Sequence, residues 1–337
     1  MRHRPRRMDR RGALKLAGGF LLGLTTPAWT RRSEGVRHVS SNESIQQAVD
    51  RAPPGSTILV APGTYLETVI IDKPLKLVSQ GGYRATVIQA DRSKFAWRGR
   101  TRSDYIVGAI NVTRTEDVLI DGFTLLDALE GLWVSASRRV LIRGCMSCGH
   151  QSSGYYFWAS QNATLMNSEA SQNAVGVYQG ASVSISIIGN LMRRNHGGRV
   201  PHLDNVAYPG IGILVGNSST GCQIAGNTCR NNLDWGIGIS MGITDVAIVH
   251  NEARANRVGL FVGTRGVSAN NNNFAGNREY GLQSAVATNA RHNWWGDASG
   301  PSGAGPGHGD AVTPEVLYDP WLRTPEDIAK PEFTLEL

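Results

Sequence analysis

Cysteine is scarce in this chain, whose 337 residues contain only Cys145, Cys148, Cys222 and Cys229. The close pair Cys145 and Cys148, followed by His150, suggests a metal site. However, no second Cys-x-x-Cys and no His-x-x-x-His lies nearby to complete a tetrahedral zinc site. The spacing therefore favours a local disulfide or two small buried thiols, and no metal ligand is assigned.

Excess charge is also missing once residues 1–30 are set aside. The formal net charge of the whole chain is +7, but residues 1–30 contain seven basic residues and one acidic residue. The rest of the chain contains 27 basic and 26 acidic residues. A nucleic-acid-binding domain usually carries a basic patch of its own. This charge balance therefore argues against nucleic acid as a partner.

Long apolar runs are lacking as well. The run that ends at Leu24 is too short to span a bilayer, and no later stretch is long enough. It follows the pair Arg10 and Arg11 and precedes small residues at 26–28 that are typical of a cleavage region. This segment resembles a twin-arginine export signal. The resemblance implies that residues 1–30 are removed, and that the protein is exported to the periplasm or the cell exterior with no membrane span.

The apolar spacing of three and four residues that marks helical repeats is missing, and a different repeat dominates the chain. A glycine that opens a short apolar strand recurs every 22 to 24 residues, with one interval of 36. Its positions are 108, 131, 154, 176, 212, 236, 259 and 281. The segments alternate with a period of two and are rich in Val, Ile and Gly, which indicates strands. The repeat predicts an all-β fold, a single parallel β-helix (solenoid) with three strands in each coil.

Each repeat carries a second strand, and asparagines five residues apart follow it. The pairs are Asn190/Asn195, Asn227/Asn232, Asn251/Asn256 and Asn272/Asn277. Neighbouring coils of a β-helix lie about 4.8 Å apart, and amide side chains at that spacing can form hydrogen-bonded ladders along the axis. We therefore interpret these asparagines as structural.

The two ends of the repeat carry segments that can cover an open coil. Residues 41–52, "SNESIQQAVDRA", predict a short capped helix. Its apolar face is expected to consist of Ile45, Ala48 and Val49. At the other end, residues 293–301 and 318–322 supply the tryptophans of a C-terminal aromatic cap.

The N-terminal segment, the asparagine-spaced coils and "NWWGDASGPSGAGPGHGDAV" together resemble the secreted right-handed β-helix proteins of the pectin-lyase-like superfamily. The resemblance covers about residues 39–322, leaves 323–337 as a tail, and implies a right-handed coil. That superfamily includes polysaccharide lyases, glycoside hydrolases, uronate epimerases and periplasmic proteins linked to copper-enzyme maturation. The fold alone does not choose among these activities.

A row of aromatic residues is predicted on one outer face. In the pattern Gly-apolar-x-apolar the two apolar residues point into the coil, so the residue between them points outward. Trp133, Tyr156 and Tyr178 occupy this outward position in successive coils. Stacked rings suit the apolar faces of sugars, and exposed aromatics often mark a binding surface. We therefore predict substrate binding by these three residues, with ordinary packing beneath covering loops as the alternative.

Two insertions leave the coil at the same turn, at residues 91–104 and 196–210. They lie four coils apart, roughly 19 Å along the axis, with the aromatic coils between them. The sequence therefore predicts a groove with an aromatic floor and a loop at each end. The first loop is basic, and the arginines predicted to bind substrate are Arg98, Arg100 and Arg102. This charge favours an acidic, uronate-type polysaccharide as the partner, with a merely solvated loop as the alternative.

Uronate lyases and epimerases both remove the C5 proton beside a carboxylate. This step needs a base and a group that neutralises the carboxylate, which can be arginine or Ca²⁺; Ca²⁺ is therefore a candidate cofactor. The second insertion concentrates suitable side chains. We predict His202 as base or acid, Asp204 as its orienting partner, Arg199 as the carboxylate-binding group and Tyr208 as a proton-transfer group.

Hydrolysis is the competing activity. Acids stand just before the glycine-anchored strands at Glu130, Asp234 and Glu279. Asp234 and Glu279 are two coils apart, about 9.6 Å, at the upper edge of the separation in inverting glycosidases. However, Arg257 is predicted to lie between them, and the polygalacturonase motifs are absent. A lyase or epimerase is therefore favoured over a hydrolase.

A non-catalytic role stays open beside the enzymatic ones. The protein could bind polysaccharide without transforming it, or act as a periplasmic accessory factor of the copper-maturation type. The chain has six methionines and eight scattered histidines but no recognisable copper motif.

Overall fold

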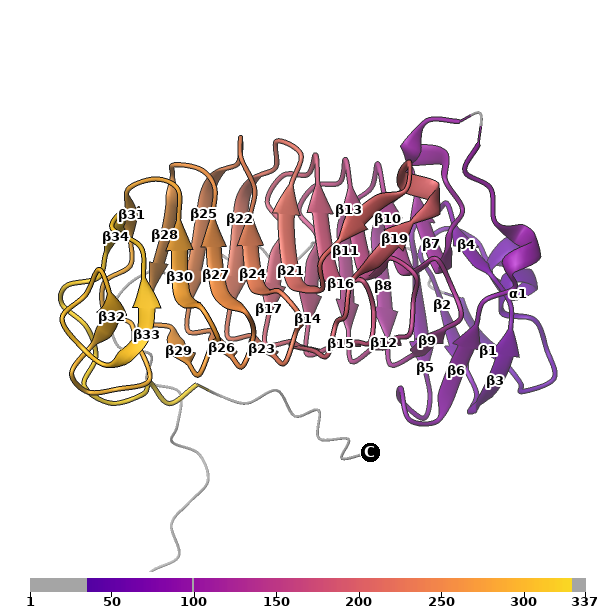
Figure 1. The fold of residues 1–337 in the computed structure, drawn as a ribbon. Coiled ribbons are helices and arrows are strands. Elements are labelled where there is room, and N and C mark those ends of the chain that lie inside the picture. Colours follow the sequence, from indigo (N-terminus) through magenta and orange to yellow (C-terminus); the bar gives the residue numbers. More distant parts are fainter. Residues whose placement is uncertain (1–34, 99, 329–337) are drawn as a thin grey trace, which may run out of the picture. The chain divides into compact units, whose positions relative to one another are not determined.

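Three parallel β-sheets form the walls of a solenoid of about 11 turns. The structure is a computed structural model that describes residues 35–98 and 100–328. The predicted export signal (1–30) and the end of the tail (329–337) lie outside the described residues. In Figure 1 the strands stand in rows, and the coils of residues 56–284 each contribute one strand to each row. The predicted all-β parallel β-helix is confirmed.

The strand bounds within the described residues are as follows. Sheet A contains β1 (Val36–Val39), β2 (Ser56–Val60), β5 (Leu75–Ser79), β8 (Glu116–Asp121), β11 (Arg138–Arg143), β14 (Thr164–Met166), β17 (Ser186–Ile188), β22 (Thr220–Ala225), β25 (Thr244–Val249), β28 (Val267–Asn270), β31 (Thr288–Asn289) and β34 (Val316–Leu317). Sheet B contains β3 (Gly63–Leu66), β6 (Thr86–Gln89), β9 (Thr124–Leu126), β12 (Met146–Cys148), β15 (Glu169–Ser171), β18 (Leu191–Arg193), β23 (Thr228–Arg230), β26 (Glu252–Arg254) and β29 (Asn273–Ala275). Sheet C contains β4 (Val69–Ile71), β7 (Gly108–Thr113), β10 (Glu130–Ser135), β13 (Ser153–Trp158), β16 (Val175–Gly180), β21 (Ile211–Gly216), β24 (Trp235–Ile239), β27 (Val258–Val262), β30 (Tyr280–Ser284), β32 (Pro301–Gly303) and β33 (Gly309–Val312).

The repeat read from the sequence maps directly onto sheet C. Every repeat glycine from 108 to 281 lies in a strand of this sheet, from β7 to β30. Strand β16 pairs with β21 in regular register although 36 residues separate their glycines, since Tyr178 faces Leu214. The insertion at 196–210 therefore leaves the stacking of the coils unchanged.

The turn from sheet A to sheet B uses a left-handed residue in successive coils. The residues with positive φ at this turn include Gly122, Gly144, Asn167, Gly189 and Gly226. Glycine adopts this conformation without a Cβ penalty, and asparagine tolerates it better than most residues do. The sharp corner is thus encoded locally in each repeat.

Side-chain amides join the coils along the axis. The backbone N–H of Asn190 donates to Asn227 Oδ1 at 2.9 Å, and the N–H of Asn227 donates to Asn251 Oδ1 at 2.9 Å. Asn227 Nδ2 also donates to the Ile187 carbonyl at 2.8 Å. This ladder continues through Asn272 to Asn293. The predicted structural role of the asparagines is confirmed, because they satisfy buried turn groups.

A second ladder begins at His150 and ends at an acid. It runs through Asn173, Asn195, Asn232, Asn256 and Asn277 to the carboxylate of Asp310. His150 Nδ1 accepts from the Ala128 N–H at 3.2 Å, whereas its Nε2 is buried without a partner. Burial lowers the pKa of His150 to about 4. This histidine is therefore held neutral where the other coils place asparagine.

Both predicted end caps are present. Helix α1 (Ile45–Arg51) has Ser44 as its N-cap, and the Gln47 N–H donates to Ser44 Oγ at 3.1 Å. Its buried residues are Ile45, Ala48 and Val49, as predicted. At the other end the buried Trp295 ring stacks on Phe274 with a centroid distance of 5.1 Å.

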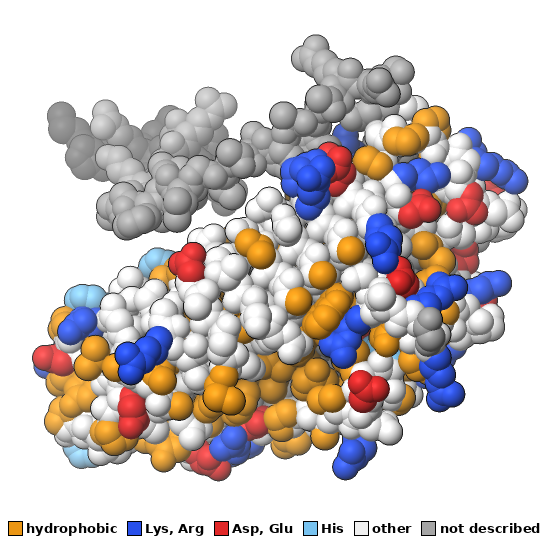
Figure 2. Space-filling model, turned by 90° about the horizontal axis from the view of Figure 1, so that it is seen from above, with side chains coloured by type: hydrophobic (Ala, Val, Ile, Leu, Met, Phe, Trp, Pro, Cys, Tyr) orange, Lys and Arg blue, Asp and Glu red, His pale blue; other side chains and the backbone are white. Residues whose placement is uncertain are grey.

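Within the described residues, no helix combines the length and the apolar character needed to cross a membrane. On the face seen in Figure 2, basic and acidic side chains of the described residues are interspersed. This pattern agrees with the charge balance of the chain beyond its first 30 residues.

We expect Asn227→Ala to lower the free energy of unfolding. The Asn190 N–H and the Ile187 carbonyl lose their side-chain partner, at about 1–3 kcal/mol for each buried group left unpaired. Urea denaturation followed by circular dichroism measures this loss. Asn42→Ala is the control, because Asn42 is exposed and has no side-chain hydrogen bond among the described residues; equal effects of the two substitutions contradict the ladder.

His150 gives the fold a pH dependence. The ordinary pKa of histidine in an unfolded chain is about 6.5, above the value of about 4 in the fold, so the unfolded chain binds the proton more readily. The stability contributed by neutral His150 is complete above pH 6.5, and about 3 kcal/mol is lost as the pH falls to 4. His150→Asn restores the ladder residue and should remove this part of the acid sensitivity in melting curves recorded across that range. An unchanged pH profile contradicts the assignment.

Candidate functional site

The predicted aromatic row lies on the outer face of sheet C. Trp133, Tyr156 and Tyr178 face one another in the register of β10, β13 and β16. Their ring centroids are 4.5 Å and 4.6 Å apart. The inward neighbours of Trp133, Leu132 and Val134, belong to the core inside the coil. The outward position of the three rings is therefore confirmed.

The aromatic row is not open to solvent. Trp133 and Tyr156 have no exposed surface, and Tyr178 is 5% exposed. Val200 and Leu203 of the second insertion belong to the same apolar cluster as the rings. The expectation of a solvent-open aromatic floor is therefore wrong, and the packing alternative describes the geometry. Apolar residues of the insertions gain burial by closing over the rings.

The first insertion contains two 3₁₀ turns, η1 (Arg92–Lys94) and η2 (Arg102–Asp104). Its two arms meet through an antiparallel bridge between Ala96 and Ile106. The Ser103 carbonyl accepts from Thr113 Oγ1 at 3.0 Å and from Ser135 Oγ at 2.8 Å, which ties the insertion to the coils.

Only one of the three predicted arginines of this insertion reaches the aromatic region. The Arg102 guanidinium lies 4.4 Å from the centre of the Trp158 ring and influences the nearby tyrosines. Arg98 and Arg100 are exposed. Arg102 is held by a cation–π contact, whereas Arg98 and Arg100 extend into solvent.

The second insertion is a hairpin that lies over sheet C. It consists of β19 (Gly198–Val200), the 3₁₀ turn η3 (Pro201–Leu203) and β20 (Val206–Tyr208). Strands β19 and β20 pair antiparallel, and Figure 1 shows β19 across β10, β13 and β16. Asp204 and Asn205 adopt left-handed φ angles that turn the chain. This hairpin carries His202 beneath its turn.

His202 and Glu130 form a buried pair. His202 Nε2 lies 2.8 Å from Glu130 Oε1, and neither side chain is exposed. The other carboxylate oxygen of Glu130 accepts from the Ser153 N–H at 2.6 Å. A carboxylate only accepts hydrogen bonds, so Nε2 carries a proton. In the neutral ring Nδ1 is then an unprotonated nitrogen, and it is buried without a partner.

Three phenols lie close enough to Glu130 for its negative charge to raise their pKa values. Burial raises the pKa of Tyr156, Tyr178 and Tyr208, whereas the positive charge of Arg102 lowers each of them. The Tyr208 ring lies 5.8 Å from that of Tyr178, edge to face. The structure thus brings predicted site residues from both insertions and from sheet C together with Glu130.

Several buried polar atoms in and beside this group of residues have no hydrogen-bond partner among the described residues. Besides His202 Nδ1 they are Trp133 Nε1, Tyr156 Oη and Ser153 Oγ. A buried polar group without a partner costs about 1–3 kcal/mol. Such groups are rare in folded proteins, and a catalytic role, a bound ligand or an ordered water can account for them. We call Glu130, His202, Tyr156, Tyr178, Tyr208 and Arg102 the roofed cluster.

The structure separates the other two residues predicted in the second insertion from His202. Asp204 is exposed and makes no side-chain hydrogen bond or ion pair with the described residues. Arg199 is exposed too, and its Nη1 donates to the Asn205 carbonyl at 3.4 Å. The carboxylate that contacts His202 is Glu130 and not Asp204, because η3 turns the histidine inward and leaves the aspartate at the tip.

Sequence reasoning noted Glu130 as an acid before a repeat glycine but missed its pairing with His202, 72 residues away. The signal in the sequence that could have revealed this pairing is the outer row of sheet C to which Glu130 belongs. In sheet C the strands that follow β10 place Ser153, Val175 and Ile211 at the corresponding outer position. A carboxylate beside such residues needs a buried partner.

Arg257 lies between the two competing acids, as predicted. Arg257 Nε lies 2.5 Å from Asp234 Oδ1, and the same guanidinium pairs with Glu279. An arginine therefore occupies the space between the two acids that an inverting hydrolase needs for its sugar and water.

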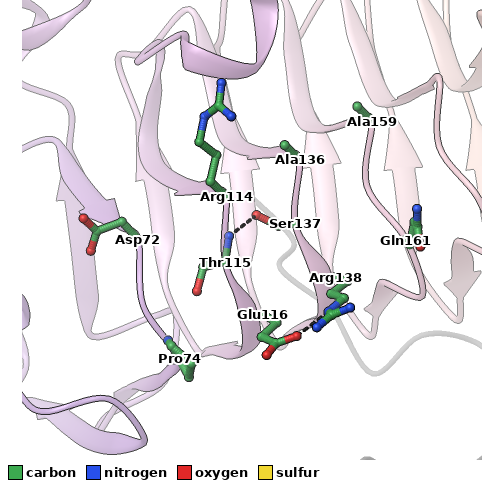
Figure 3. A pocket seen from close by; sticks show the side chains of 10 residues that line it. All are labelled: Asp72, Pro74, Arg114, Thr115, Glu116, Ala136, Ser137, Arg138, Ala159 and Gln161. Carbon is green, nitrogen blue, oxygen red and sulfur yellow. Dashed lines mark hydrogen bonds and ion pairs between the residues drawn. The ribbon is translucent and has the colours of Figure 1, made fainter.

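An open groove of about 540 Å³ lies elsewhere, where sheet C turns into sheet A (Figure 3). Three of its four charged side chains are paired: Arg114 with Asp104 at 2.5 Å, and Arg138 with Glu116. The Thr115 N–H donates to Ser137 Oγ at 3.2 Å. We therefore interpret this groove as an ordinary solvated corner of the coil and not as a functional site.

The cysteines form no disulfide in the described residues. Cys145, Cys222 and Cys229 are buried and Cys148 is half-buried, and burial raises the pKa of Cys145 to about 12. The thiol alternative therefore describes this structure. No group of three or more histidine, cysteine, aspartate or glutamate side chains within residues 35–98 and 100–328 could hold a metal ion.

A family model described as "right handed beta helix region" matches residues 108–293. The chain belongs to this family. The match confirms the predicted hand of the coil, and it includes both the aromatic row and the second insertion of this β-helix protein. A comparison with curated proteins gives no significant match.

Solved structures share the fold at low sequence identity. An alginate lyase from Paenibacillus sp. str. FPU-7 is 15% identical with a TM-score of 0.64, covering 83% of this chain and 98% of that one. A polygalacturonase from Erwinia carotovora ssp. carotovora is 12% identical with a TM-score of 0.56, covering 81% and 85%. At these identities the likeness of this β-helix protein to them establishes the fold.

We expect Glu130→Ala to loosen the hairpin. The substitution leaves His202 Nε2 and the Ser153 N–H without an acceptor, and breaking one side of a buried pair costs about 3–5 kcal/mol. Limited trypsin digestion read by mass spectrometry should show faster cleavage after Arg199 in β19. Asp204→Asn is the matched control on the same hairpin and should leave the cleavage rate unchanged; cleavage at the wild-type rate in Glu130→Ala contradicts the anchoring role.

Proposed function

We propose that this protein removes the C5 proton from uronate units of an acidic polysaccharide, as a lyase or a C5-epimerase, at the roofed cluster. The observation that carries the proposal is the buried His202–Glu130 pair. Glu130 fixes the proton on Nε2 and leaves Nδ1 as a base with no partner. A histidine oriented by a carboxylate is a common general base.

The other members of the roofed cluster supply the remaining chemistry. Arg102 neutralises the uronate carboxylate while negative charge develops beside C5. In a lyase, His202 takes the C5 proton, the bond from C4 to its oxygen breaks, a C4–C5 double bond forms, and a tyrosine hydroxyl protonates the leaving oxygen. In an epimerase, a tyrosine instead returns a proton to C5 from the opposite face. Tyr208 and Tyr178 are the candidates for this acid, since each retains some exposed surface.

Substrate reaches the roofed cluster only when the hairpin 196–210 lifts. Glycines with positive φ stand at both ends of the hairpin, Gly197 with φ +80° and Gly210 with φ +95°. Residues at such junctions can absorb the backbone rotation of a moving cover. A closed cover excludes water, which strengthens the electrostatic interactions within the site.

Two further observations support an acidic polysaccharide as the substrate. The structure named as an alginate lyase matches this chain over 83% of its length with the same coil. The first insertion also places Arg98 and Arg100 in solvent beside the cover, where they can attract an anionic chain. The leader at residues 1–30 fits an exported protein that meets such a polymer in the periplasm or outside the cell.

Polysaccharide binding without turnover is the second candidate. The observation in its favour is that the three rings of the aromatic row are packed and closed in this structure. Hydrolysis is less favoured, because Arg257 fills the space between Asp234 and Glu279.

The test uses the mature protein with alginate and polygalacturonate. A lyase raises the absorbance of unsaturated uronate, and an epimerase exchanges the C5 proton with solvent deuterium. We expect His202→Gln to lower either rate by about 10²–10⁴-fold, the usual contribution of a general base. Tyr208→Phe tests the proton-transfer role with loss of a single hydroxyl group.

Asp204→Asn is the control and should keep full activity, because its side chain does not contact His202. Circular dichroism confirms that each variant is folded. A folded His202→Gln variant with wild-type activity contradicts the site. Retention on a polysaccharide column without turnover by the wild-type protein supports the binding role instead.

A further inference from the structure

Three arginines stand in register on the outer face of sheet B, a different wall of the solenoid from the roofed cluster. Arg193 of β18 faces Arg230 of β23, which faces Arg254 of β26. We call these three residues the arginine column. Strands β23 and β26 lie along the lower edge of Figure 1. Parallel coils repeat about every 4.8 Å, so the column places one cationic side chain on each of three successive coils.

The coil itself does not require arginine at this outer position. In the same register the neighbouring coils carry Cys148 and Ser171 on one side and Ala275 on the other. These residues are small and uncharged. Arg193 pairs with the buried Glu169 of the fold, but no described carboxylate pairs with Arg230. Three consecutive arginines therefore concentrate like charges in a row that otherwise has small side chains.

The positive charge of the column is only partly neutralised. Arg193 pairs with the buried Glu169 at 2.8 Å, and Arg254 lies 3.1 Å from Glu252. The guanidinium of Arg230, between them, makes no hydrogen bond or ion pair with any described residue. Its pKa is lowered first by burial and then by the charges of Arg254, Arg193 and Arg194. The three arginines of the column and the neighbouring Arg194 lie near two glutamates, Glu169 and Glu252, so this group of side chains keeps a net positive charge.

We propose that the arginine column binds a uronate chain that runs along the solenoid axis, at a second site distinct from the roofed cluster. Guanidinium forks bind carboxylates through paired, charge-assisted hydrogen bonds. A polyuronate presents one carboxylate on each sugar, at a spacing comparable with one coil. Half-buried Arg230 binds the central carboxylate, and Arg254 and exposed Arg194 flank it.

The choice of a polyuronate as the ligand rests on the proposed function, and the charges of the column hold that polymer along sheet B. Binding there requires neither catalysis nor movement of the hairpin. The two proposals can therefore fail separately.

The experiment measures the affinity of the mature protein, without residues 1–30, for polygalacturonate by isothermal titration calorimetry at several salt concentrations. We expect Arg230→Gln to weaken binding about 10-fold or more and to reduce its salt dependence. Arg265→Gln is the matched control, since Arg265 is exposed and has no side-chain partner among the described residues. Melting temperatures confirm that both variants are folded.

Arg230→Gln with wild-type affinity overturns the proposal, and so does equal weakening by Arg265→Gln, which indicates diffuse attraction. Polyglutamate that binds as tightly as polygalacturonate overturns a sugar ligand. A variant that ends at residue 328 tests whether the acidic segment 329–337 occupies the arginine column instead of the polymer. If this variant binds polygalacturonate more tightly, and Arg230→Gln abolishes the gain, the polymer is not the primary ligand of the column. Loss of binding in His202→Gln while Arg230→Gln binds normally assigns the polymer to the roofed cluster alone.

Discussion

The axial hydrogen bonding between coils is the constraint on which the rest of this structure depends. Backbone ladders of three parallel sheets set the rise of each coil, and the asparagine ladders extend the same spacing through the turns. The N–H of Asn227 is satisfied only when Asn251 of the next coil is in place, so no coil is complete without its neighbours. Because the rise and the register are fixed, side chains at equivalent positions form straight rows along the outer walls.

The aromatic row of sheet C and the arginine column of sheet B differ in how far other residues cover them. The aromatic row of sheet C is covered by insertions that leave the coil at one turn. These insertions do not change the strand register, since β16 and β21 pair across the second insertion. In the arginine column of sheet B, Arg193 is buried against Glu169, whereas Arg230 and Arg254 are half-buried. Apolar rings gain free energy from burial, whereas unpaired guanidinium groups lose solvation by it. The physical chemistry of each row therefore agrees with where the protein places its covering hairpin.

Burying Glu130 and His202 together beneath that hairpin is costly for stability. The attraction between two such groups repays desolvation only when their hydrogen bonds are good, and here one imidazole nitrogen stays without a partner. The hairpin could have been sealed by apolar residues alone, as Val200 and Leu203 partly do. A polar pair retained at this place is consistent with a chemical role, and the same pair links the cover to the wall of the coil.

The sequence by itself determined everything that repeats. The glycine period located the coils, the alternation within each strand placed Trp133 outward, and the spacing of acids and bases placed Arg257 between Asp234 and Glu279. These features depend on contacts between equivalent positions of neighbouring coils, so one repeat predicts the next. Only the tertiary structure decided that the hairpin closes over the aromatic row and that His202 meets Glu130. An insertion has no periodicity, and its side chains are directed by the apolar surface it happens to cover, which lies several coils away in sequence.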